Sequence, residues 1–198
     1  PRHHNIWAGP SLLNPDLRNV NTWSYALPTG KGSRFQPAKA LDRIAGDWQF
    51  SGTAEFSQGA HQAVYLSTDS SGTGQTHPMP DRVPNCDPNK IPGGRTRLAW
   101  INNACFTVPA FGEFGNSHLG AFVEPGVENW NLSLQKSFPI PKLEGNQLHF
   151  QADFFNALNH TQWGYVNNTL VTSWTSQLGR VGSTHPARMI QFSLKYLF

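Results

Sequence analysis

One stretch decides the fold class of this chain: Ile190-Gln191-Phe192-Ser193-Leu194-Lys195-Tyr196-Leu197-Phe198, in which apolar and polar side chains alternate. Successive side chains of an extended strand point to opposite faces. One face therefore carries the apolar set Ile190, Phe192, Leu194, Tyr196 and Phe198. The other face is polar except for Leu197. The stretch predicts a β-sheet with one apolar and one polar face, and its aromatic last residue leads us to expect that this end is held rather than frayed into water.

The composition favours an all-β protein with long loops. Only 14% of the 198 residues are charged, against about 25% in a typical soluble protein. Aromatic residues and turn formers are abundant, with 13 Phe, 7 Trp, 18 Gly and 15 Pro. The net charge of +3 is spread along the chain, which argues against a nucleic-acid partner. No run approaches the roughly 18 apolar residues of a transmembrane helix, whereas membrane-spanning β-strands of ~10 residues give weaker alternating signals.

Four further stretches alternate in the same way as the first. The expected bounds of the five strands are 20–27, 46–57, 129–138, 147–156 and 188–198. Lys136 interrupts the apolar face of the third strand near its end. A lysine close to a membrane interface can extend its ammonium group to the headgroups, so we expect the end of this strand to lie near an interface.

The segments between the predicted strands alternate between long and short. We expect periplasmic turns and external loops to alternate in this way, because outer-membrane barrels have short periplasmic turns and long external loops. The predicted external loops are 1–19, 57–126 and 161–186, and the predicted periplasmic turns are 28–45 and 139–146. The C-terminus is then periplasmic. The longest loop, 57–126, is expected to be irregular apart from a possible short strand at 63–66.

The two cysteines, Cys86 and Cys105, both lie in the longest predicted loop. Their simplest interpretation is one disulfide that closes part of this loop, stabilising it by roughly 3 kcal/mol. A disulfide implies an oxidising compartment. The alternative is a pair of free thiols or a catalytic cysteine, which requires a histidine partner that the sequence does not place.

Several strings carry a family resemblance, in the same order along residues 16–198. They are Tyr25-Ala26-Leu27-Pro28-Thr29-Gly30-Lys31-Gly32, Gly46-Asp47-Trp48-Gln49-Phe50-Ser51-Gly52, Phe111-Gly112-Glu113-Phe114-Gly115-Asn116, Asn131-Leu132-Ser133-Leu134-Gln135-Lys136-Ser137-Phe138, Phe154-Phe155-Asn156-Ala157-Leu158-Asn159-His160 and Pro186-Ala187-Arg188-Met189-Ile190-Gln191-Phe192. With them the chain resembles the C-terminal end of a TonB-dependent outer-membrane receptor. The resemblance is to the Oar-like type, which has a carboxypeptidase-regulatory-like N-terminal domain.

The resemblance implies that the chain is a fragment of a barrel of roughly 22 strands, in the outer membrane of a Gram-negative bacterium. The plug domain and most of the barrel would then belong to parts of the protein outside residues 1–198. Five strands alone leave two open edges, which a bilayer does not tolerate. A small barrel of about eight strands is the other possibility. The implied partners are outer-membrane lipid, the barrel assembly machinery, which would read Ile190, Phe192, Leu194, Tyr196 and Phe198, and the TonB system through the missing plug.

The expected function is binding of an extracellular nutrient and its energised import, and the nutrient itself is not identified by the sequence. The candidates for the barrel lumen are Glu55, His149, Gln151 and Asp153. The candidates for external aromatic ligand contacts are Trp100, Trp163 and Trp174. We expect no enzyme activity, because His149 and Asp153 would lie ~13 Å apart along one strand. We expect no metal site, because His3-His4 has no third ligand at a useful spacing, and we expect no cofactor. A secreted β-sandwich adhesin or carbohydrate-binding module with one disulfide is the alternative.

Overall fold

The computed structural model describes residues 9–10, 12, 15–29, 44–141, 143, 145–171 and 176–198. The chain forms two compact units. We call the first the sheet unit; it comprises Asn19–Phe56, Glu128–Thr161 and Pro186–Phe198. We call the second the loop unit; it comprises Pro1–Arg18, Ser57–Val127 and Gln162–His185. No helix in the described part of the chain is both long and apolar enough to cross a membrane.

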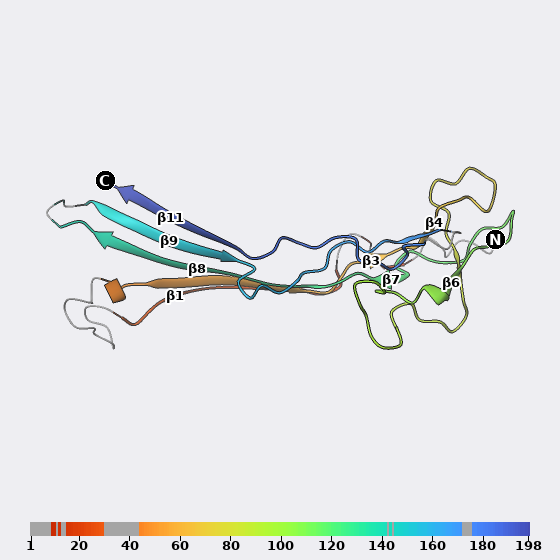
Figure 1. Cartoon of the computed structure of the whole chain (residues 1–198), viewed down its shortest axis with the longest axis horizontal. Helices are drawn as coiled ribbons and strands as arrows, with labels where there is room; N and C mark the ends of the chain where they lie inside the picture. The colour runs from red at the N-terminus through yellow and green to blue at the C-terminus, as the bar shows by residue number, and fades with distance from the viewer. Residues whose placement is uncertain are drawn as a thin grey trace. The chain divides into compact units, whose positions relative to one another are not determined.

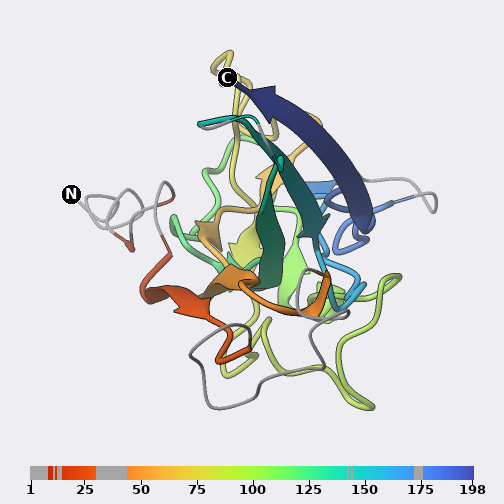
Figure 2. The same cartoon turned by 90° about the vertical axis from the view of Figure 1, so that its left-hand side faces the viewer.

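The sheet unit is built on one five-stranded antiparallel sheet (Figure 1). Its strands are β1 (Arg18–Ala26), β2 (Gln49–Ser57), β8 (Val127–Pro139), β9 (Gln147–Phe155) and β11 (Met189–Leu197). Their order in the sheet, β1-β2-β8-β9-β11, is also their order along the chain. The structure therefore confirms the five-stranded antiparallel meander that the alternating pattern predicts. Figure 2 shows that the sheet is curved rather than flat.

The pairing register keeps the two kinds of side chain on separate faces of the sheet. Phe154 on β9 lies opposite Leu132 on β8 and Ile190 on β11. One position earlier on β9, Asp153 lies opposite Ser133 and Gln191. A slip of one residue in either pairing would mix the faces. The alternation of each strand therefore adds up to one continuous apolar face and one continuous polar face.

Aromatic side chains are distributed along the apolar face of the sheet. The Trp130 ring packs edge-on against Trp23 and Phe56, with centroids 5.9 and 5.6 Å away. Further along the strands, the Phe150 ring packs against Trp48 and Phe192, with centroids 6.0 and 6.3 Å away. Ring contacts across strands therefore help to hold the sheet together on its apolar face.

Lys136 is arranged differently from the sequence-based expectation. Only 4% of its surface is exposed, and its Nζ donates hydrogen bonds to the carbonyl oxygens of Ile44 and Gly46. The ammonium group also lies 5.0 Å from the centre of the Phe138 ring and 5.7 Å from that of Trp48. The expected extension into the headgroups is therefore wrong, because backbone carbonyls of the chain itself already solvate the charge. Lys136 instead ties β8 to the residues that precede β2.

The described part of the loop unit contains six strands of two residues each. They are β3 (His61–Gln62), β4 (Tyr65–Leu66), β5 (Asp81–Arg82), β6 (Phe106–Thr107), β7 (Phe122–Val123) and β10 (Thr169–Leu170), with a 3₁₀-helix, η1 (Asn103–Cys105), before β6. β3 pairs with β7 and β5 with β6 in antiparallel fashion, whereas β10 and β4 are parallel. The parallel pair joins segments about a hundred positions apart in the sequence, Tyr65 and Thr169.

A hydrophobic core holds the loop unit together. Its largest fully buried side chains include Phe122, Ile101, Leu178, Val64 and Val166. These residues come from both 57–126 and the second long segment. The segment 57–126 is irregular apart from two-residue strands and one 3₁₀-helix, and the sequence-based prediction did not include its packed core. The strands are too short for a period-two pattern, and the core residues are spaced irregularly along the chain, so alternation could not reveal them. The possible strand at 63–66 is present as β4 alone.

The connections from β2 to β8 and from β9 to β11 are long, and most of their residues belong to the loop unit. The connection from β8 to β9 is short, and within it Ile140 N donates to Asn146 O at 3.0 Å. The connection between β1 and β2 lies mostly outside the described residues, so the predicted alternation of periplasmic turns and external loops stays a prediction.

Candidate functional site

The polar face of the sheet carries three of the four predicted lumen residues on β9. His149 Nδ1 lies 3.1 Å from Ser137 Oγ on β8. Gln151 Nε2 donates to both carboxylate oxygens of Asp153 at 2.9 Å. His149 and Asp153 thus have different hydrogen-bond partners and do not form a dyad. The fourth residue, Glu55, is half-buried on β2.

A row of amide side chains crosses the same face. Gln135 Nε2 on β8 donates to Gln49 Oε1 on β2 at 2.8 Å, and Gln49 Nε2 donates to Ser24 Oγ on β1 at 2.7 Å. Gln135 also lies opposite Gln151 on β9, which lies opposite Ser193 on β11. The row is uncharged and can donate and accept hydrogen bonds along its length. Sequence reasoning placed these residues on the polar face but missed their connection, because it depends on the register between strands.

The predicted disulfide between Cys86 and Cys105 is present. Cys105 is fully buried in the core of the loop unit, and Cys86 packs against that core. Arg82 Nη2 donates to the Cys86 carbonyl oxygen at 2.7 Å, and Val83 N donates to that of Cys105 at 3.0 Å. The bridge therefore anchors the segment between the cysteines to the core at both ends.

The structure describes two of the three predicted external aromatics. Trp100 is partly buried against the core, and its Nε1 donates to Val123 O at 2.9 Å. The Arg95 guanidinium covers its ring at 5.0 Å from the ring centre. Trp163 also packs partly buried against the core, and Trp174 lies outside the described residues. Trp100 and Trp163 thus have packing roles, and their contact with a ligand stays a prediction.

The segment closed by the disulfide forms a cleft of about 690 Å³, within the range of small-molecule sites. Its lining combines amides, charged side chains and a small apolar patch: Asn85, Cys86, Asp87, Asn89, Lys90, Ile91, Pro92, Gly94, Arg95 and Asn102. We call it the disulfide-loop cleft. Sequence reasoning missed it because its residues follow one another in an aperiodic polar segment, and only the folding of that segment brings them around one space.

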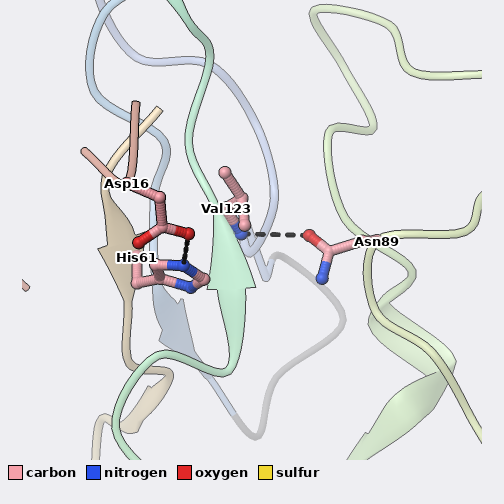
Figure 3. Close-up of polar contacts among 4 residues, drawn as sticks. All are labelled: Asp16, His61, Asn89 and Val123. Carbon is pink, nitrogen blue, oxygen red and sulfur yellow. Dashed lines mark hydrogen bonds and ion pairs between the residues drawn. The ribbon is translucent and has the colours of Figure 1, made fainter. Parts of the chain in front are cut away.

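Asn89 connects the disulfide-loop cleft to the short strands of the loop unit. Its Oδ1 accepts a hydrogen bond from Arg95 Nη2 at 2.9 Å and another from Val123 N on β7 at 3.0 Å. Figure 3 shows the contact with Val123 beside a second one on β3, where His61 Nε2 lies 2.8 Å from Asp16 Oδ2. β3 and β7 are paired with each other. The cleft is thus held in place by side-chain contacts to a paired strand.

Two arginines, Arg95 in the cleft lining and Arg82 next to Cys86, interact with the Asp87 carboxylate of the cleft. Burial lowers the pKa of both Arg82 and Arg95, and the nearby Asp87 carboxylate opposes this effect without cancelling it. Both side chains remain cationic at neutral pH, because an arginine pKa starts above 12. The part of the chain that the structure describes contains no group of three or more His, Cys, Asp or Glu side chains able to hold a metal ion.

Comparison with known proteins identifies the family to which the chain belongs. The family model described as "Outer membrane beta barrel domain" matches residues 1–191, almost the whole chain. The chain therefore belongs to this family, and it is an outer-membrane β-barrel protein. Membership of this family excludes the alternative of a secreted β-sandwich adhesin or carbohydrate-binding module. Neither the curated proteins nor the solved structures gave a match.

Proposed function

We propose that this chain is the C-terminal part of the barrel of a TonB-dependent outer-membrane receptor of the Oar-like type, which binds an extracellular nutrient and supports its energised import. One observation carries the proposal. The long connections from β2 to β8 and from β9 to β11 fold into a unit with its own core and disulfide. A barrel that served only as an anchor or a simple pore would not require such a unit. A receptor requires it, because ligand capture depends on loops held in a defined arrangement.

The strand count supports a large barrel. In the described sheet, β1 and β11 each have one neighbouring strand. Open edges are not stable in a bilayer, so further strands have to complete the closure. A receptor barrel of roughly 22 strands would supply them, together with the plug through which the TonB system acts.

The proposed orientation follows from the lengths of the connections. The loop unit would be extracellular, while the turn after β8 and the C-terminus would be periplasmic, as in other outer-membrane barrels. The apolar face would contact lipid. The polar face, with Glu55, His149, Gln151 and Asp153, would line the lumen and support transport rather than catalysis. Ile190, Phe192, Leu194, Tyr196 and Phe198 would serve as the signal for the barrel assembly machinery.

Orientation can be tested by cysteine labelling of intact cells that produce the complete receptor. Gly93 lies in the loop unit and Gly145 in the turn after β8, and a Cβ at either position would meet no atom within 4 Å. Both residues have a positive φ, +84° and +83°, so a cysteine carries a similar backbone strain at either position and the two variants are matched. We expect a membrane-impermeant maleimide to label Gly93→Cys and not Gly145→Cys. Both variants should be labelled equally after the cells are broken. Labelling of Gly145→Cys alone on intact cells would reverse the orientation.

Import can be tested by comparing cells with and without the complete receptor in a mixture of siderophores, oligosaccharides, peptides and small organic acids. Depletion of each compound is followed by mass spectrometry, with and without a protonophore. We expect at least one compound to be depleted only when both the receptor and the proton-motive force are present. Equal depletion by both strains across the mixture would overturn the import function. Deletion of Phe198 should lower the amount of receptor in the membrane, and an unchanged amount would refute the assembly role.

A further inference from the structure

The disulfide-loop cleft is a preorganised part of the loop unit. Asn102 N donates to the carbonyl oxygen of Pro88 at 2.8 Å, which joins the two sides of the closed segment. A turn between them is closed by a hydrogen bond of 3.0 Å from Gly94 N to Ile91 O. Together with the Cys86–Cys105 bridge, these bonds already order the loop. The loop therefore loses less conformational entropy when a ligand binds.

Two cationic side chains line the cleft, and they differ in how firmly the structure holds them. Arg95 is held between the Asn89 side chain and the Trp100 ring, which leaves most of the donors of its planar fork for another partner. Lys90 is exposed at the same cleft. Among the described residues, no ion pair joins either cation to Asp87, whose Oδ1 accepts from Asn89 N at 2.9 Å.

The other lining residues indicate the kind of ligand. Ile91 and Pro92 supply an apolar wall, and the side chains of Asn85 and Asn102 supply amide groups. The volume of about 690 Å³ exceeds what an inorganic anion would fill. An organic molecule with anionic groups satisfies all three features, because its carbon skeleton can contact the apolar wall while its charges meet the cations.

We propose that the disulfide-loop cleft binds a small organic carboxylate, with Arg95 and Lys90 each contacting a carboxylate group. The planar guanidinium matches a carboxylate through two parallel hydrogen bonds. The ammonium group of Lys90 adds a point charge that can follow ligands of different length. The inference rests on the proposed receptor function and deepens it by naming the chemical class of the ligand.

The binding test uses the complete receptor purified in detergent and succinate as the probe. Isothermal titration compares the native protein with Arg95→Gln, Lys90→Gln and Arg97→Gln. Arg97 is an exposed arginine that does not line the cleft, so its loss controls for net charge. We expect Kd to rise about tenfold for Arg95→Gln and about threefold for Lys90→Gln, since charge-assisted hydrogen bonds are lost. Arg97→Gln should leave Kd unchanged.

Folding and binding can be separated in this design. Arg95→Gln also removes the contact with Trp100 and can disturb the loop, so its fold is checked by limited proteolysis. Among the described residues, the Lys90 side chain makes no recorded hydrogen bond or ion pair, so Lys90→Gln removes the charge without breaking a recorded contact. Equal Kd for Lys90→Gln and the native protein, or an equal loss in Arg97→Gln, would overturn the inference.

Two further probes define the ligand class. Succinamide has the same skeleton without charges and should not bind, and inorganic phosphate should bind more weakly than succinate. Phosphate binding as tight as that of succinate, or no saturable succinate binding by the native protein, would overturn the carboxylate assignment. Energised uptake unaffected by Arg95→Gln and Lys90→Gln would refute this inference and leave the import function standing. Succinate binding without any energised uptake would refute the import function and leave the ligand assignment of the cleft standing.

Discussion

The two units of this chain are stabilised in different media. In the loop unit, Phe122 and Ile101 are 0% and 1% exposed and belong to one buried core. In the sheet unit, Phe192 and Leu194 on β11 remain 67% and 62% exposed. A row of large apolar side chains at such exposure is unfavourable in water and favourable against lipid. The loop unit is therefore organised around a buried core, whereas the apolar face of the sheet unit is open and suits contact with lipid.

The difference extends to the polar groups. On the polar face of the sheet, Gln49 and Gln135 pair with each other across strands and remain accessible. In the loop unit, polar side chains such as Asn89 are used to hold one segment to another. Changes in the core of the loop unit should therefore alter its stability alone, and changes in the sheet should alter insertion or the sheet itself.

The largest effect is expected for Phe122→Ala. Removing this fully buried ring should destabilise the loop unit by about 3–5 kcal/mol, because it leaves a cavity in a closed core. Amide hydrogen exchange of the receptor in detergent, read by mass spectrometry, would report the two units separately. Phe192→Ala on the sheet is the matched control and should leave exchange in the loop unit unchanged. Equal protection of the loop unit in both variants would contradict the idea of an independent core.

The disulfide should have the next largest effect. Cys86 and Cys105 are 19 positions apart, and the chain-entropy relation gives ~3 kcal/mol for a loop of this length. Cys86→Ala combined with Cys105→Ala should lower the urea midpoint of the loop unit, followed by tryptophan fluorescence in detergent. Adding a reductant should lower the midpoint of the native protein and not that of the double variant. A midpoint that does not move in either experiment would show that the core alone stabilises the unit.

A smaller effect, confined to the sheet, is expected for Lys136→Met. The variant keeps the apolar stem but removes the ammonium group from the carbonyls of Ile44 and Gly46. Hydrogen bonds from a charged group contribute about 1.5–3 kcal/mol. Hydrogen exchange should therefore increase around Ile44 and Gly46 and not in the loop unit. If protection there is retained, the lysine is not what ties β8 to this segment.

The smallest effect is expected at Asp69 in the loop unit. A hydrogen bond from the Ser71 hydroxyl, and others from the backbone N–H groups of Gly74, Gln75 and Ser71, lower the pKa of Asp69 from 3.8 to about 2. Because the folded-state pKa is depressed, this stabilisation is present above pH 3.8 and is lost as the pH falls towards 2. Exchange at Gly74 and Gln75, corrected for intrinsic rates, should rise over that interval. Asp69→Asn should remove this pH dependence, and its persistence would assign it to another group.

Much of the fold could be predicted from the sequence because the sheet is regular. Alternation along Ile190–Phe198 and four other stretches is a local property, and it predicts the strands and their two faces without any contact between them. The disulfide was also predictable, because Cys86 and Cys105 are the only two cysteines. The loop unit was not predictable in this way. Its strands are two residues long, and its core joins residues as distant as Val64 and Leu178.

The sequence by itself therefore determined which face of each strand is apolar, since side-chain direction in a strand follows from position alone. Only the tertiary structure decided how the strands register, that Lys136 is solvated by carbonyls, and that the disulfide-loop cleft exists. The first two depend on which distant segments meet, and the third depends on how one aperiodic segment folds back on itself. Contacts between segments are set by packing and hydrogen bonding in three dimensions, which leave no periodic trace along the chain.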